Sequence, residues 1–169
     1  GWYVTVLTSN RYCRNPKGKI KPKKEKLNEV NVIRAFRPPF NQAGKISRLI
    51  NAFWLFMVWG WKLIWLPRYD VVIVGTDPQF AALIFPFLWL TRQGKIKVHW
   101  CFDLFPEAIY AAGVNLFLKI PLKILSFLMK ISYRFVDVMV DLGPCMRRRL
   151  DKYKHKARKE TLVPWALNE

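Results

Sequence analysis

Residues 69–107 read YDVVIVGTDPQFAALIFPFLWLTRQGKIKVHWCFDLFPE, and this stretch decides the fold. Two short apolar runs, 70–75 and 95–102, predict β-strands, and a polar turn follows each of them. Residues 79–92 are long and apolar enough for one buried helix between the strands. A strand, a crossover helix and a second strand form a parallel unit whose ligands bind beyond the carboxyl ends of the strands. Both turns fall at that end, so we expect the functional site there.

The composition bounds the class of protein. A chain of 169 residues can bury the core of one domain. Lys and Arg total 29 against 11 Asp and Glu, a net charge of +18, which predicts an anionic partner: nucleic acid, an anionic membrane surface or a phosphorylated substrate. Aromatic residues make up 15% of the chain and include 8 Trp, and this excess favours the membrane interface.

The cysteines indicate a redox compartment. Cys13, Cys101 and Cys145 are odd in number and widely spaced, without metal-like spacing or a disulfide framework. This usage is typical of a reduced cytoplasmic compartment. The sequence starts at Gly1, already inside an apolar segment, so we interpret it as a fragment of a longer protein.

The first third of the chain predicts two strands and a long helix. Residues 2–8 and 30–35 have the β-branched and aromatic pattern of strands, and the basic segment 9–26 between them is predicted to be a mobile loop, either simply solvated or in contact with phosphates. Residues 45–66 predict a helix with an apolar run through Trp61. Asn51 and Lys62 confine that run.

The sequence leaves three interpretations of where this long helix lies. The one we prefer places one helix face on a sheet and its tryptophans partly at a membrane surface. An ordinary buried crossover helix is the second reading, and a single bilayer span over residues 51–66 is the third. The tryptophans concerned are Trp54, Trp59, Trp61 and Trp65.

The last third alternates again between helices and strands. We expect helices over 108–113, 121–134 and 143–153, a strand over 135–142, and a last short strand over 160–164 after a basic loop. Without hairpin signals, this alternation predicts an α/β fold with a doubly wound parallel sheet. The second of these helices carries a narrow basic stripe that fits either a sheet-covering helix or one resting on anionic lipid: Lys119, Lys123, Ser126, Lys130 and Arg134.

Few side chains in the predicted crevice have the chemistry of a reactive site. Asp103 and Glu107 are four residues apart, so a first helical turn would place both carboxylates on one side. Asp103 could orient or deprotonate a hydroxyl, or it could simply cap the short helix. His99 lies inside a strand, where a satisfied core histidine is the default and a catalytic role the alternative. The chain shows no Ser-His-Asp order, Walker loop or dinucleotide glycine fingerprint.

Four segments together carry a family resemblance. They are WYVTVLT at 2–8, YDVVIVGTDPQF at 69–80, KVHWCFDLFPE at 97–107, and residues 136–150 followed by ETLVPW at 160–165. In this order and spacing the chain resembles the N-terminal half of GT-B glycosyltransferases of the GT4-like, glycosyl-group-1 kind. It looks closest to the sugar transferases of exopolysaccharide, O-antigen and colanic-acid-type assembly.

The resemblance implies an architecture and an activity. Residues 1–164 would form the acceptor-side, Rossmann-like domain without its first strand, and 165–169 would begin the linker to a C-terminal donor-binding domain. Such an enzyme transfers a hexose-like sugar from a nucleotide-sugar donor to a lipid-linked acceptor at the cytoplasmic membrane face, with retention and without a metal or cofactor. The donor would bind mainly to the C-terminal domain, so the fragment is expected to be inactive alone.

Site residues carry over only where the motifs match. Asp103, Pro106 and Glu107 match the family's DLxPE motif, which makes Asp103 the candidate for contacting the acceptor hydroxyl. His99 stays a second catalytic candidate on its position in the preceding strand, not on the motif. Residues of the two turns would bind the acceptor: Thr76, Asp77, Pro78, Phe105 and Glu107. Peripheral membrane contact is assigned to Trp54, Trp59, Trp61, Lys123, Lys130 and Arg134.

A second class of function remains. The charge and the tryptophans also fit a non-enzymatic basic module that binds nucleic acid or a membrane, because Trp can stack on bases. The aromatic residues, however, lie in long apolar runs and are not interleaved with Lys and Arg. We therefore favour the transferase and expect no nucleic acid partner.

Overall fold

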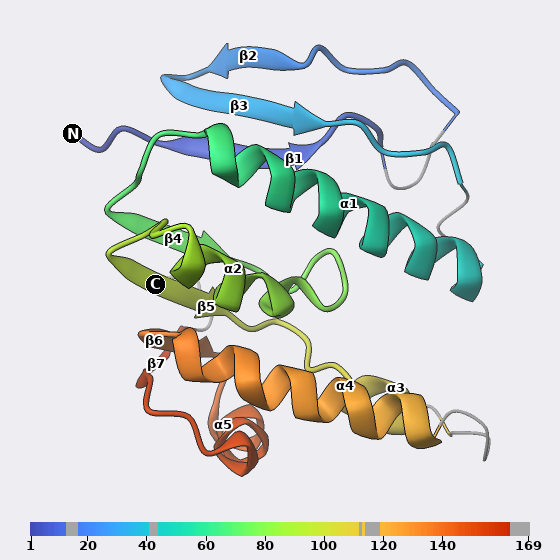
Figure 1. Ribbon diagram of the computed structural model, residues 1–169, viewed down its shortest axis with the longest axis vertical. Coiled ribbons are helices and arrows are strands. Elements are labelled where there is room, and N and C mark those ends of the chain that lie inside the picture. The colour runs from blue at the N-terminus through green and yellow to red at the C-terminus, as the bar shows by residue number, and fades with distance from the viewer. Residues whose placement is uncertain (13–16, 41–43, 112, 114–118, 163–169) are drawn as a thin grey trace, which may run out of the picture. The chain divides into compact units, whose positions relative to one another are not determined.

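The computed structural model describes residues 1–12, 17–40, 44–111, 113 and 119–162 (Figure 1). The chain divides into two compact units, Gly1–Leu66 and Pro67–Glu169, and each unit has its own sheet. The predicted linker, 165–169, lies outside the described residues, and the single domain over 1–164 stays a prediction.

The sheet of the first unit has three strands in the order β1-β3-β2. Strand β1 (Thr5–Ser9) pairs in parallel with β3 (Val30–Ala35), and β2 (Lys24–Leu27) pairs antiparallel with β3. The strand predicted over residues 30–35 is confirmed, and the first strand starts three residues later than expected. Val32 and Ala35 of β3 are buried, whereas β2 is an edge strand of mostly exposed residues.

The β2–β3 hairpin corrects the prediction of a basic loop through residue 26 and of a chain without hairpins. Asn28 and Glu29 both have positive φ angles, 44° and 69°, and they form the two-residue turn that suits the twist of a hairpin. The sequence of β2, KEKL, has low strand propensity, so pairing with β3 decides its structure. An ion pair between Arg34 and Glu25 joins the two strands, and lysines on the edge strand oppose further pairing.

Helix α1 (Lys45–Trp65) confirms the helix predicted over 45–66. Its small and aliphatic residues Ala52, Leu55 and Leu63 are buried. Asn51 is also buried, and its Nδ2 donates a hydrogen bond to the carbonyl of Phe40 at 3.1 Å. Among the residues that the structure describes, none belongs to a helix with both the length and the apolar character required to cross a membrane.

The sheet of the second unit has four strands, all parallel, in sequence order (Figure 1). They are β4 (Val71–Val74), β5 (Ile96–Trp100), β6 (Val138–Asp141) and β7 (Arg158–Thr161). The first three lie inside the predicted segments. Strand β7 starts two residues before the predicted one, because Arg158 pairs with Val138 at the edge of the sheet although its own sequence is charged.

Helical segments connect these strands. Between β4 and β5 lie the 3-10 turn η1 (Ala81–Ile84) and α2 (Phe85–Leu90), where one continuous α-helix was expected. Pro86 explains the difference, because it has no N–H for an α-helical bond and Phe85 instead donates to the carbonyl of Ala82. The remaining segments are α3 (Glu107–Ala111), α4 (Lys119–Ser132), η3 (Tyr133–Phe135), α5 (Pro144–Leu150) and η4 (Asp151–Tyr153).

The core of the second unit lies between the sheet and these helices. The ring of His99 on β5 contacts Phe85 of α2 and Tyr133 of η3, with ring centroids 5.5 and 5.6 Å apart. Met139 is its neighbour on β6, and α2 packs against α4. The second unit is therefore an α/β structure with a parallel sheet flanked by helices, a Rossmann-like arrangement.

Candidate functional site

The predicted crevice lies at the carboxyl ends of β4 and β5. Because the strands are parallel, the turn after β4 and the turn after β5 leave the same edge of the sheet. Phe80, which follows the first turn, contacts Phe105 of the second turn edge to face, with ring centroids 5.5 Å apart. Each turn contains a cis peptide bond before proline, Asp77–Pro78 and Phe105–Pro106. The structure thus brings together the two segments that the sequence singled out.

Asp103 and Asp77 are the exposed carboxylates of this edge. In the described part of the chain, the carboxylate of Asp103 makes no hydrogen bond or ion pair. The N–H of Ala108, in the first turn of α3, is bonded to the carbonyl of Leu104 at 2.8 Å. No described backbone N–H donates to the Asp103 carboxylate, so the helix cap considered for this residue is not formed in the described part of the chain. An exposed, unpartnered carboxylate is free to meet a ligand. Thr76 and Pro78, which flank Asp77 in the turn after β4, are half-buried.

Glu107 differs from Asp103, although both belong to the DLFPE segment. Its Oε1 accepts a hydrogen bond from the hydroxyl of Tyr153, and its Oε2 is buried without a partner among the described residues. Burial raises the pKa of Tyr153, and the hydrogen bond and charge of Glu107 raise it further. Glu107 therefore ties the DLFPE segment to η4.

His99 lies in the interior of the second unit with 1% of its surface exposed. Its Nδ1 is 3.0 Å from the carbonyl of Val74, so the neutral ring donates there. Burial lowers the pKa of His99 to about 4, and the Val74 bond opposes that shift. This environment is that of a satisfied core histidine, the default reading of its sequence position.

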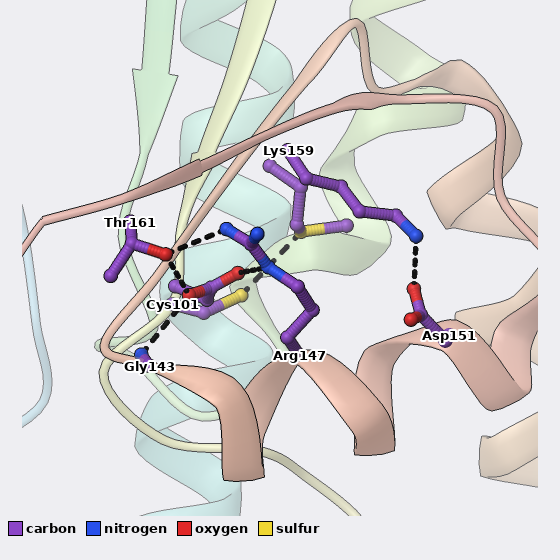
Figure 2. Close-up of polar contacts among 8 residues, drawn as sticks. Cys101, Gly143, Arg147, Asp151, Lys159 and Thr161 are labelled. Carbon is purple, nitrogen blue, oxygen red and sulfur yellow. Dashed lines mark hydrogen bonds and ion pairs between the residues drawn. The ribbon is translucent and has the colours of Figure 1, made fainter.

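Asp141 is a buried carboxylate that the sequence analysis did not identify. Figure 2 labels the three residues that donate hydrogen bonds to it, Gly143, Arg147 and Thr161. Asp141 is the last residue of β6, and it accepts hydrogen bonds from the N–H of Gly143 at 3.0 Å, the Nε of Arg147 at 2.7 Å and the hydroxyl of Thr161 at 2.9 Å. Arg147 also donates to the hydroxyl of Thr161 at 2.6 Å. The available signal was an aspartate ending an apolar strand directly before a Leu-Gly-Pro turn.

Cys101 lies next to this network. Its Sγ is 3.6 Å from the sulfur of Met139, and both side chains are buried. Burial raises the pKa of the Cys101 thiol, and the negative charges of Asp141 and Glu107 raise it further. A thiol held in this form is a core residue.

The residues assigned to membrane contact differ in exposure. On α1, Trp61 is 65% exposed and Trp54 is 42% exposed, whereas Trp59 is half-buried with its Nε1 unpartnered within the described ranges. On α4 and η3, Lys123 and Arg134 are exposed and Lys130 is half-buried.

Metal ligands do not gather in the described residues: no group of three or more His, Cys, Asp and Glu side chains there could hold a metal ion. Comparison with known protein families and with curated proteins finds no match to this chain.

Proposed function

We propose that this chain is the acceptor-side half of a GT-B glycosyltransferase of the GT4-like kind. The enzyme transfers a sugar from a nucleotide-sugar donor, with retention and without a metal, to a lipid-linked acceptor in cell-surface polysaccharide synthesis. The parallel β4–β7 sheet is one part of the doubly wound sheet that this proposal requires. The donor binds mainly to a C-terminal domain.

The observation that carries this proposal is the unpartnered carboxylate of Asp103 at the carboxyl edge of the sheet. A ligand hydroxyl in the crevice can donate its hydrogen bond to Asp103, since no protein group in the described ranges occupies that carboxylate. A carboxylate in this position orients the hydroxyl and can accept its proton as the new glycosidic bond forms. Positioning of the acceptor supplies a large part of the rate in such a transfer.

The neighbouring groups hold Asp103 in place and shape the acceptor site. Glu107 anchors one end of the DLFPE segment to Tyr153, and the contact between Phe80 and Phe105 joins this segment to the turn after β4. Thr76 and Asp77 of that turn offer a hydroxyl and a second exposed carboxylate for the other hydroxyls of a saccharide.

Helix α4 supports the part of the proposal that concerns the membrane. It buries Leu122, Met129 and Ser132, and it leaves large apolar side chains exposed beside exposed lysines. It contains no acidic residue. A helix of this kind suits the interface of an anionic membrane, where a polyprenyl-linked acceptor resides. The exposed side chains are Lys119, Ile120, Lys123, Ile124, Phe127 and Leu128.

The test is flotation of the purified chain with anionic vesicles that either contain or lack a polyprenyl-diphosphate-linked saccharide. We expect a larger bound fraction with the saccharide lipid. Asp103→Asn should reduce that increment by about tenfold, because a charge-assisted hydrogen bond is lost. Glu29→Gln is the matched control, since it removes one exposed carboxylate far from the site along the chain.

The outcomes separate the two parts of the proposal. Equal binding to both kinds of vesicle, or equal loss in both variants, would contradict the acceptor site at Asp103. A wild-type chain that binds neither kind would contradict membrane association. Release of the bound chain by high salt is expected for peripheral attachment.

A further inference from the structure

The outward face of the α5–η4 segment carries a basic depression that the proposed function does not use. Cys145, Arg148, Arg149 and Lys152 line a hollow of about 360 Å³. Their spacing of three, four and seven residues places them on one face of the helical segment. Arg147 belongs to the opposite side, where it binds Asp141 (Figure 2).

The three cations of this hollow have no carboxylate partner within the described ranges. Arg148 donates one bond, to the Sγ of Cys145 at 3.5 Å. Acidic residues near these cations along the chain have other partners: Asp141 pairs with Arg147 at 2.7 Å, Asp151 with Lys159 at 2.5 Å and Glu160 with Arg158 at 2.6 Å. Figure 2 shows the Asp151–Lys159 pair.

This arrangement is unfavourable without an anion. Like charges three and four residues apart on a helix repel one another. A bound anion relieves that repulsion, and the planar guanidinium groups of Arg148 and Arg149 match the oxygens of a phosphate through paired hydrogen bonds. Lys152 adds a third charge on the same hollow.

We propose that Arg148, Arg149 and Lys152 form a binding site for a phosphate-class anion. The ligand is either the phosphate of a lipid headgroup or a soluble phosphate or diphosphate, and both share the chemistry that the hollow recognises. The site does not depend on glycosyl transfer. It is separate from Asp103, which lies at the carboxyl end of β5.

Calorimetric titration of the full chain with inorganic pyrophosphate at low salt tests the site. The variant Arg148→Gln/Arg149→Gln/Lys152→Gln should bind at least about tenfold more weakly, because charge-assisted bonds are lost. The matched control is Lys19→Gln/Lys24→Gln/Lys26→Gln, which removes three exposed charges from another part of the chain and should retain affinity within about twofold.

Two results would overturn the proposal. One is an equal loss of pyrophosphate affinity in both triple variants, which would indicate a general effect of net charge. The other is a wild-type chain that binds no pyrophosphate. If the first triple variant does not fold, judged by circular dichroism, Arg149→Gln alone should still weaken binding by about threefold or more, and unchanged affinity would overturn the site.

Vesicles of phosphatidylglycerol distinguish the two sources of phosphate. Suppose that Arg148→Gln/Arg149→Gln/Lys152→Gln floats less with these vesicles than the wild type, and that pyrophosphate competes with the vesicles for the wild-type chain. The ligand is then the lipid headgroup. Unchanged flotation together with lost pyrophosphate binding identifies a soluble ligand. Asp103→Asn should bind pyrophosphate like the wild type, so this site and the acceptor site can fail independently.

Discussion

Asp103 and Asp141 lie at the ends of neighbouring parallel strands, but they have opposite environments. Asp141 has 1% of its surface exposed and accepts three hydrogen bonds, from Gly143, Arg147 and Thr161. Asp103 is exposed and has no partner in the part of the chain that the structure describes. The same residue type, at or just after the carboxyl end of a parallel strand, stabilises the fold in one case and is available to a ligand in the other.

The difference in hydrogen bonding separates a structural carboxylate, Asp141, from one that is available to a ligand, Asp103. Removing the buried carboxylate of Asp141 leaves the Nε of Arg147, the hydroxyl proton of Thr161 and the N–H of Gly143 without their acceptor. An exposed carboxylate without partners costs the fold little when it is removed. Stability measurements therefore separate the two roles.

Asp141→Asn should lower the free energy of unfolding by about 3 kcal/mol, because the partly exposed Arg147 loses the charge of its buried partner. Urea unfolding followed by circular dichroism measures this change. Thr161→Val serves as a milder control and should cost about 1–2 kcal/mol, because it removes two hydrogen bonds of an exposed hydroxyl, one to Asp141 and one from Arg147. A loss below about 1 kcal/mol for Asp141→Asn would remove the contrast between the two aspartates.

His99 makes stability depend on pH. Its pKa is lowered to about 4 in the folded chain, against an ordinary value of about 6.5 when unfolded. The unfolded state therefore binds more protons below pH 6.5, and stability present above that pH is lost as the pH falls toward 4, by up to about 3 kcal/mol.

The check is the difference in urea midpoints between pH 7 and pH 4 for the wild type and for His99→Asn. The variant should lose less stability over that interval, because it has no imidazole to protonate. Equal losses in the two proteins would show that other groups carry the pH dependence.

Tyr153→Phe should cost about 1–2 kcal/mol, because it leaves both oxygens of the Glu107 carboxylate without a partner in a partly buried position. Tyr110→Phe is the matched control, because Tyr110 is exposed, and it should change the free energy of unfolding by less than about 0.5 kcal/mol. Thermal unfolding of the two variants side by side compares them. Equal effects would mean that Glu107 does not anchor the DLFPE segment.

Asp103→Asn should leave the free energy of unfolding within about 0.5 kcal/mol of the wild type, as expected for an exposed side chain without partners. The same variant is expected to lose the saccharide-dependent part of vesicle binding. A stability loss above about 1 kcal/mol would show that Asp103 has a structural role after all.

Much of the fold could be predicted from local patterns. The strand over residues 30–35, the long helix α1 and the parallel pair β4–β5 agree with the sequence analysis, because strand and helix periodicities differ and short β-branched runs favour strands. The two turns were also located correctly, since each directly follows a strand.

The errors have specific causes. Strand β2 is not predicted from the sequence, because KEKL has low strand propensity and the Asn28-Glu29 turn that joins it to β3 has no glycine. Strand β7 was placed two residues late for the same reason, as its first residues are charged. In both strands the pairing with a neighbour overrides local preference.

By itself the sequence determined the order of the elements, the basic charge and the position of the two polar turns, because these depend on residues close together in the chain. Only the tertiary structure decided which carboxylates accept hydrogen bonds from other groups of the protein. Thr161 reaches Asp141 across 20 residues, and Tyr153 reaches Glu107 across 46. Such partners meet only after the strands pair and the helices pack, because hydrogen bonds between distant side chains have no periodic pattern in the sequence.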